Sequence, residues 1–254
     1  MIVDRTSWGR LRVTGGDRVR FLQGLTTVNV EALADGAHGW GAILNPKGRV
    51  LSVIDIARLG DTFVIACAGS LADKTLQILE RYAVMDDVVF EPIQGPAHQV
   101  FGDPWTAPIV EGAGDAARPD DDPEIERLRI RAGFLRYGSD VDEDHFPFET
   151  PLARLLDYGK GCYVGQEPVF RVHAQGNSAR TLRGIVVAGT APLATGAAVK
   201  HATKSNAGLV TSSIADGDHT LVLAYVHRTC WDPGGSVEID GRAGVIHELP
   251  MVGA

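Results

Sequence analysis

The sequence predicts an α+β protein that ends in a small β-barrel. Residues 1–180 mix short β runs with helical stretches, whereas residues 181–254 contain only short β runs, most of them separated by Gly or Pro turns. The second pattern is typical of a small barrel or sandwich, and the first of helices packed on antiparallel strands. We therefore expect an α+β region at 1–180 and a β-barrel domain at 181–254.

A strand and a short helix open the chain. Residues 8–15 alternate apolar and polar side chains, which is the period of a half-buried strand. Asp17 is a residue type that caps helix N-termini, and Gly24 is the type that most often ends helices. We therefore predict a helix over residues 18–23, between these two positions.

The next segment predicts a β-hairpin, a strand and the clearest helix of the chain. Residues 40–44 and 49–56 are apolar runs that flank the turn sequence Asn-Pro-Lys-Gly, a strong hairpin signal. Residues 62–67 form another apolar run. Ser70 and Asp73 then resemble a capping box, with Asp in place of Glu or Gln, and apolar residues follow at helical spacing.

The middle of the chain predicts less regular structure before the barrel begins. Residues 86–91 return as a strand, and residues 102–124 are rich in Pro, Gly and Asp, which predicts a loop. Residues 124–132 carry alternating charges and predict a short helix or strand. The barrel strands are expected at residues 181–187, 197–200, 207–211, 221–226, 236–239 and 242–246.

The composition is ordinary for a globular protein that buries a sizeable core. Of 254 residues, 44% are hydrophobic and 22% are charged. The formal net charge of −8 argues against direct binding of nucleic acid, which needs a basic surface. Because the N-terminus lacks the layout of a signal peptide and no apolar run approaches membrane-spanning length, we expect a soluble, cytoplasmic protein without a membrane partner.

The three cysteines do not form a framework of their own. Cys67, Cys162 and Cys230 are too few and too scattered for a set of disulfides. No Cys-x-x-Cys pair occurs, so the sequence shows no self-sufficient zinc or iron–sulfur site. Cys67 lies in an apolar run, which predicts a core position, and we expect Cys230 to be partly exposed beside a turn.

The most informative stretch is the segment 160–167, Lys-Gly-Cys-Tyr-Val-Gly-Gln-Glu, called the cysteine motif below. Its two glycines allow close approach of the backbone to a ligand. The ammonium of Lys160, and the positive end of a helix that opens near Pro168, would favour the thiolate of Cys162. The alternative is that Cys162 is a small buried hydrophobe in a tight turn.

The cysteine motif resembles the hallmark of the YgfZ family of folate-binding, iron–sulfur-related proteins, which are relatives of the glycine-cleavage T-protein, an aminomethyltransferase. Weaker similarities bring the resemblance to nearly the whole chain; they lie at residues 21–30, 45–49, 129–133, 138–140, 147–149, 208–212 and 223–226. The motif residues that carry the resemblance are Lys160, Gly161, Cys162, Tyr163, Gly165, Gln166 and Glu167.

The resemblance implies a cloverleaf of lobes, two of them in residues 1–180, around a hole that takes tetrahydrofolate or a folate derivative. It also implies a role in assembly or repair of iron–sulfur proteins, including enzymes that modify transfer RNA. The implied partners are folate and iron–sulfur scaffold, carrier or client proteins. Because clusters usually take about four cysteine ligands, Cys162 could hold a transient cluster only together with a partner.

Four residues are candidates for contact with the folate. Lys160 could bind the glutamate tail of the folate or favour the thiolate of the motif. Asp140 and Glu149 could accept hydrogen bonds from pterin N–H groups, since two adjacent donors match a carboxylate. Arg171 could contact the ligand, or pair with Glu167 across one helical turn.

Three functions stay open from the sequence. The first is a folate-binding accessory factor that acts through Cys162, and we expect this rather than a classical transferase. The second is a folate-dependent methyl- or aminomethyltransferase, for which Lys74 stands where the resemblance places a catalytic acid and Asp73 is adjacent. The third is a binding module that folate only stabilises. His173 could line the same cleft or be a structural residue, and the oligomeric state is open.

Overall fold

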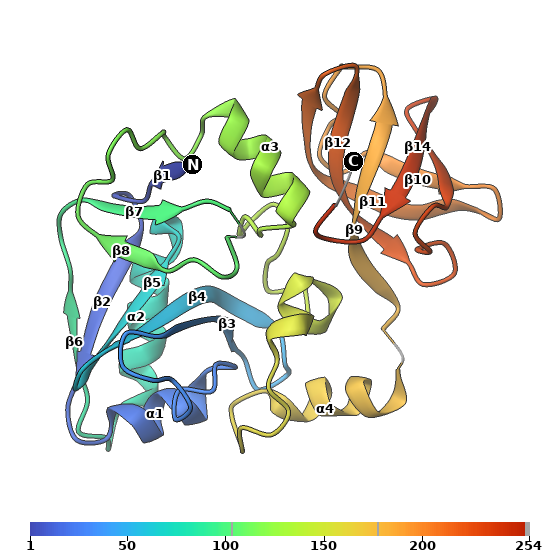
Figure 1. The fold of residues 1–254 in the computed structure, drawn as a ribbon. Coiled ribbons are helices and arrows are strands. Elements are labelled where there is room, and N and C mark those ends of the chain that lie inside the picture. The colour runs from blue at the N-terminus through green and yellow to red at the C-terminus, as the bar shows by residue number, and fades with distance from the viewer. Residues whose placement is uncertain (103, 177, 252–254) are drawn as a thin grey trace. The chain divides into compact units, whose positions relative to one another are not determined.

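The structure is a computed structural model that describes residues 1–102, 104–176 and 178–251 (Figure 1). The chain divides into two compact units. The first contains Met1–Pro119, Asp142–Pro147 and Leu152–Ala174; the second contains Asp120–Val141, Phe148–Pro151 and the residues from Gln175 onward. The separate folding of residues 1–180 and 181–254 as domains stays a prediction.

An antiparallel five-stranded sheet with the order β3-β4-β5-β2-β6 forms the centre of the first unit. Its strands are β2 (Gly9–Thr14), β3 (His38–Leu44), β4 (Val50–Leu59), β5 (Thr62–Cys67) and β6 (Val89–Pro92). A three-stranded sheet has the order β1-β7-β8, formed by β1 (Ile2–Asp4), β7 (Ala97–Val100) and β8 (Ile109–Glu111). The predicted hairpin is therefore confirmed, and β8 lies in a segment predicted as a loop.

Helix α1 (Arg18–Leu25) begins where it was predicted and ends beyond Gly24, at the cap residue Thr26. Asp17 precedes it, but the Asp17 side chain makes no capping bond. Its carboxylate instead accepts a hydrogen bond from the backbone N–H of Asp87 at 2.9 Å. The prediction of side-chain capping here is wrong because a long-range partner occupies the carboxylate.

Helix α2 (Ala72–Tyr82) follows a 3₁₀ turn at Gly69–Leu71. The predicted capping box is wrong, because Ser70 lies in this turn and the cap position is Leu71, which has no side-chain capping bond. The hydroxyl groups of Ser52 on β4 and Thr75 on α2 are 2.9 Å apart. This buried contact places α2 against the face of the sheet on which the Ser52 side chain lies. Figure 1 shows α2 along that sheet.

The remaining helical elements surround the cysteine motif in sequence. They are α3 (Pro123–Ala132), the 3₁₀ turns Pro147–Glu149 and Pro151–Leu155, and α4 (Gln166–Gln175). Pro168 lies in the first turn of α4, where a missing backbone N–H costs nothing. Helix α3 begins with a side-chain cap, since Asp122 accepts from the backbone N–H of Glu124. It ends at Gly133, whose φ of +66° suits a glycine C-cap.

A closed barrel with the order β10-β11-β12-β9-β14-β13 forms most of the second unit. Its strands are β9 (Arg180–Ala188), β10 (Ala198–His201), β11 (Lys204–Asp216), β12 (His219–His227), β13 (Ser236–Ile239) and β14 (Arg242–His247). The predicted barrel is confirmed. Closure leaves no free sheet edge, so every strand finds a partner on both sides.

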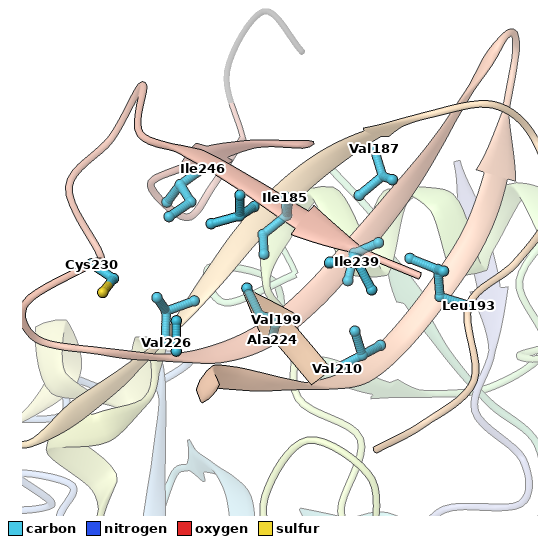
Figure 2. Packing of buried hydrophobic residues seen from close by; sticks show 13 residues of the cluster. Ile185, Val187, Leu193, Val199, Val210, Ala224, Val226, Cys230, Ile239 and Ile246 are labelled. Atoms are coloured by element: carbon cyan, nitrogen blue, oxygen red, sulfur yellow. The ribbon is translucent and has the colours of Figure 1, made fainter. Parts of the chain in front are cut away.

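The barrel core is built from β-branched and small side chains that point inward from all its strands. Figure 2 shows Ile185, Val199, Val226 and Ile246 among them. Cys230 packs in the same cluster and is only 4% exposed, so the prediction that it is partly exposed is wrong. Its thiol fills space in the core, the usual role of a buried cysteine.

Candidate functional site

Cys162 lies in the segment between the 3₁₀ turn Pro151–Leu155 and α4, within the first unit. Its side chain is exposed, whereas Cys67 and Cys230 are buried. The alternative that Cys162 is a buried hydrophobe is therefore wrong. Burial raises the pKa of Cys67 to about 11, despite a hydrogen bond with Thr75, so this second thiol is unreactive.

The cysteine motif is held on α1 by the side chain of Lys160. The amine of Lys160 donates to the backbone carbonyls of Gln23 and Thr26, both at 2.6 Å. These carbonyls lie at the C-terminal end of α1, where a helix leaves acceptors unpaired and carries partial negative charge. Lys160 is buried, so it holds the motif in place and does not extend into solvent.

The burial of Lys160 has an electrostatic consequence. Removal of the amine from water lowers the pKa of Lys160 to about 8, although the charges of Asp157 and Glu31 act in the opposite direction. The amine also lies 4.8 Å from the ring centre of Tyr163. Its predicted contact with a folate stays a prediction.

The side chain of Gln23 is a second support for the motif. Its amide nitrogen donates to the carbonyl of Lys160 at 2.6 Å and to the side-chain oxygen of Asn29 at 3.2 Å. Its amide oxygen accepts from the backbone N–H groups of Val30 at 2.8 Å and Glu31 at 3.3 Å. Gln23 is buried, and these bonds satisfy its polar atoms.

The far side of the motif rests on α1 and on the turn between β3 and β4. The backbone N–H of Val164 donates to the carbonyl of Gly24 at 3.0 Å. Gly165 has a φ of +79°, and a Cβ at this position would lie 2.3 Å from the carbonyl oxygen of Asn45. Only glycine meets both conditions, so the close packing on this turn explains the second glycine of the motif.

The next residues of the motif begin α4. Tyr163 is buried, which raises its pKa to about 12, and its backbone N–H donates to the side chain of Gln166 at 3.2 Å. Glu167 and Arg171 form the predicted ion pair at 2.9 Å. Both side chains are exposed, so the pair contributes only a few tenths of a kcal/mol.

His173 stacks on a ring of the segment that precedes the motif. Its ring lies 3.7 Å from that of Tyr158, with an angle of 19° between the planes. Tyr158 also meets Phe170 edge to face at 5.5 Å. His173 therefore has a packing role, one of the two roles expected for it.

Asp140 lies in the second unit, completely buried. Its carboxylate accepts from the guanidinium of Arg129 at 2.5 Å and from the hydroxyls of Thr211 at 2.6 Å and Ser212 at 2.8 Å. The hydroxyl of Tyr225 donates to its backbone carbonyl at 2.8 Å. Asp140 thus joins α3 to strands β11 and β12 of the barrel.

Glu149 is also buried and accepts from Arg180 at 3.1 Å. The structure does not bring Asp140 or Glu149 together with the cysteine motif in one compact unit. The folate contacts of Asp140, Glu149, Lys160 and Arg171 therefore stay predictions from the resemblance, and each side chain has an intramolecular partner here.

A cavity of ≈ 420 Å³ in the first unit was not identified from the sequence. Two indole rings, those of Trp40 and Trp105, line it at 5.8 Å from each other. Polar side chains of Asn29, His38 and Asp157 also line it. The residues come from a strand, two loops and the segment before the motif, so no sequence pattern relates them.

Each polar wall residue of this cavity is held in place. The Asn29 amide donates to the Asp157 carboxylate at 2.7 Å. That bond, and one from the Gly159 backbone, lower the pKa of Asp157. The ring of His38 is 2.7 Å from Asp55 and 3.0 Å from the carbonyl of Thr106. Burial opposes the charge on His38, but the bond to Asp55, the charge of Asp55 and the bond to Thr106 together outweigh burial and raise the pKa of His38.

A second cavity, of ≈ 240 Å³, lies at the first turn of α2. Trp8, Cys67 and Asp73 are among its lining residues. Asp73 is exposed and is not the helix cap, so it stays available as an acid for the transferase hypothesis. The neighbouring Lys74 pairs with Glu143 at 2.7 Å.

Among residues 1–102, 104–176 and 178–251, no group of three or more His, Cys, Asp or Glu side chains is placed to hold a metal ion. Within the same ranges, no helix is long and apolar enough to cross a membrane.

Comparisons with known proteins agree with the resemblance. The model of the GCVT N-terminal domain matches residues 1–101. The tRNA-modifying protein YgfZ of Yersinia enterocolitica is 25% identical, with 71% of this chain and 69% of that protein covered. The aminomethyltransferase of Saccharopolyspora erythraea is 24% identical, with 95% and 82% covered.

The crystal structure of the glycine cleavage system aminomethyltransferase T from Bartonella henselae is similar over 99% of this chain and 86% of that one. The TM-score is 0.81 at 17% sequence identity, so this likeness concerns the fold. The predicted α+β, T-protein-like fold class is confirmed.

Substitution of Lys160 by Met should change how stability depends on pH. Because the pKa of Lys160 is about 8 in the folded chain and 10.5 ordinarily, the unfolded chain binds more protons between these pH values. Lys160 therefore makes the free energy of unfolding rise with pH there, by at most about 1.4 kcal/mol per pH unit. Urea unfolding of both proteins from pH 7 to 10.5 measures this. A difference between them that does not change with pH would contradict the lowered pKa.

Asp140→Asn should destabilise the protein by about 3–5 kcal/mol, because it breaks a buried ion pair and leaves the Arg129 guanidinium partly uncompensated. Glu167→Gln is the matched control, since it breaks an exposed pair, and should cost less than about 0.5 kcal/mol. Urea unfolding at neutral pH compares the two. Equal losses would show that Asp140 does not organise the second unit.

Proposed function

Because the resemblance to YgfZ proteins and aminomethyltransferases is confirmed, we propose that this chain is a tetrahydrofolate-binding accessory factor for assembly or repair of iron–sulfur proteins. Cys162 is its reactive thiol. One observation carries the proposal: of the three cysteines, only Cys162 is exposed, and it lies on a segment fixed by buried hydrogen bonds at Lys160 and by a backbone hydrogen bond at Val164. A thiol that only filled space would need neither exposure nor such support.

We place the folate ring system in the ≈ 420 Å³ cavity of the first unit, and its lining residues support this choice. The indoles of Trp40 and Trp105 offer apolar surface to a planar heterocycle. The carboxylate of Asp157 has about four lone-pair sites; Asn29 and Gly159 donate to it, and so does the backbone of Lys160. The remaining capacity can accept an N–H donor of a pterin.

The chemistry of Cys162 requires a second molecule. A cluster that passes over this protein is cargo, and the other ligands come from the cysteines of a scaffold, carrier or client protein. The Yersinia relative is named a tRNA-modifying protein. With a net charge of −8, an effect on tRNA would be indirect, through client enzymes. A reducing cytoplasm, where thiols persist, is the fitting compartment.

A methyl- or aminomethyltransferase is the second candidate. Asp73 supports it, since this exposed carboxylate lines the ≈ 240 Å³ cavity beside Trp8. A turnover assay with tetrahydrofolate and an aminomethyl-lipoyl carrier tests this function. Turnover that Asp73→Asn abolishes and Cys162→Ser leaves intact would favour the transferase over the accessory factor.

Cys162→Ser should leave folate binding and folding unchanged but fail to restore iron–sulfur enzyme activities in cells that lack this protein. Serine keeps the size of the side chain and removes the thiolate, the form that binds iron and attacks disulfides. Cys67→Ser is the matched control, because this buried thiol lies outside the motif. If the Cys67→Ser protein folds, it should restore the activities. Full restoration by Cys162→Ser would leave a folate-binding module without thiol chemistry.

Asp157→Asn should weaken binding of tetrahydrofolate by roughly 10- to 100-fold, the effect of losing a hydrogen bond to a charged acceptor. The amide keeps the shape of the side chain and an acceptor for Asn29. Asp61→Asn removes a carboxylate that is fully exposed and should not change affinity. Titration calorimetry measures both variants, and equal affinities for them would place the folate outside this cavity.

A further inference from the structure

Two wall residues of the ≈ 420 Å³ cavity are also the first members of a hydrogen-bond chain that ends at the cysteine motif. Asn29 and Asp157 line the cavity, and the amide of Asn29 donates to the carboxylate of Asp157 at 2.7 Å. A ligand that bonds to either residue therefore acts on a pair that is already connected to other parts of the first unit.

One branch of the chain runs through Gln23. The amide nitrogen of Gln23 donates both to the side chain of Asn29 at 3.2 Å and to the carbonyl of Lys160 at 2.6 Å. Gln23 is buried and does not line the cavity. A displacement of Asn29 therefore acts on Gln23, whose amide also holds the Lys160 carbonyl.

The other branch runs along the backbone. The second oxygen of the Asp157 carboxylate accepts from the backbone N–H of Gly159 at 2.7 Å. The first branch ends at Lys160 and the second at Gly159, the two residues that directly precede Gly161. Gly161 has a φ of +90°, and a Cβ there would meet no atom within 4 Å, so this side of Gly161 faces open space.

The residues on either side of this peptide are fixed. The amine of Lys160 bonds to α1, and the backbone of Val164 bonds to Gly24. The direction of the Cys162 side chain therefore depends on the short segment between them. The carbonyl of Lys160, held by Gln23, sets the first peptide plane of that segment.

We propose that Gln23, Asn29 and Asp157 couple occupancy of the cavity to the presentation of the Cys162 thiol. A ligand bound to Asn29 and Asp157 stabilises the arrangement in which the segment is bonded to Gln23 and Gly159. A group attached to Cys162 that displaces the segment breaks this arrangement and weakens ligand binding. The identity of the ligand as a folate rests on the proposed function; the three residues are positioning residues.

Coupling of this kind is reciprocal, which makes it measurable from both ends. In the exchange with glutathione disulfide, the Cys162 thiolate attacks one sulfur, a mixed disulfide forms, and one glutathione leaves as the thiol. The equilibrium constant of this exchange, followed by intact-protein mass spectrometry, should fall at least about fivefold when 5-formyltetrahydrofolate saturates the protein. The affinity of the glutathionylated protein for the same folate should fall by the same factor.

Gln23→Met removes the connection and leaves every residue that lines the cavity unchanged; Asn29 loses its bond to Gln23 but keeps its bond to Asp157. This variant should still be saturated by the folate, and the exchange constant should become the same with and without folate. Gln23→Glu keeps the acceptor for Val30 and loses the donor to Lys160, and should give the same result if the Met variant does not fold. Cys162→Ser is the control for the other two thiols. It should form no glutathione adduct, because Cys67 and Cys230 are buried.

The outcomes separate this proposal from the function on which it rests. Folate that binds the wild type and leaves the exchange constant unchanged overturns the coupling alone. A coupling that persists in a folded Gln23 variant overturns the role of Gln23 and points to direct contact between the ligand and the adduct. Failure of the wild type to bind folate overturns both the folate site and its coupling to Cys162.

Discussion

The cysteine motif depends on one interaction, the buried amine of Lys160 on the C-terminal carbonyls of α1. Removal of an ammonium from water is costly, and here two hydrogen bonds and the negative end of a helix offset that cost. Because the amine cannot move without losing these partners, the backbone on which Cys162 sits is tied to α1. The exposed thiol of Cys162 lies two residues after this anchor.

The two units use buried charge in the same way for different purposes. In the first unit, Lys160 and Gln23 hold a segment that carries an exposed thiol. In the second, Asp140 gathers Arg129, Thr211 and the barrel around a single carboxylate. A buried polar group needs a complete set of partners, so such groups order the chain wherever they occur. In the first unit, the exposed thiol of Cys162 lies beside such a group, the buried Lys160.

The proposed folate site and the cysteine motif lie in the same unit. The cavity walls of Trp40, Trp105 and Asp157 combine apolar surface with an acceptor, and the same Asp157 is bonded toward the cysteine motif through Asn29. An accessory factor that senses its ligand and presents a thiol needs these two features connected within one unit. A module that folate only stabilised would not need the connection between them.

The sequence by itself determined the fold class, the hairpin, the barrel and the distinctive place of Cys162, because periodicity, turn residues and a contiguous motif are local properties of the chain. It did not determine what Lys160 or Asp140 contacts, since their partners lie far away in sequence, Gln23 for one and Thr211 for the other. The resemblance, and the match of their charges to a folate, made both residues candidates for a ligand. The tertiary structure paired each of them with the chain itself, and it brought Trp40 and Trp105 together, because only folding decides which distant groups lose water to one another.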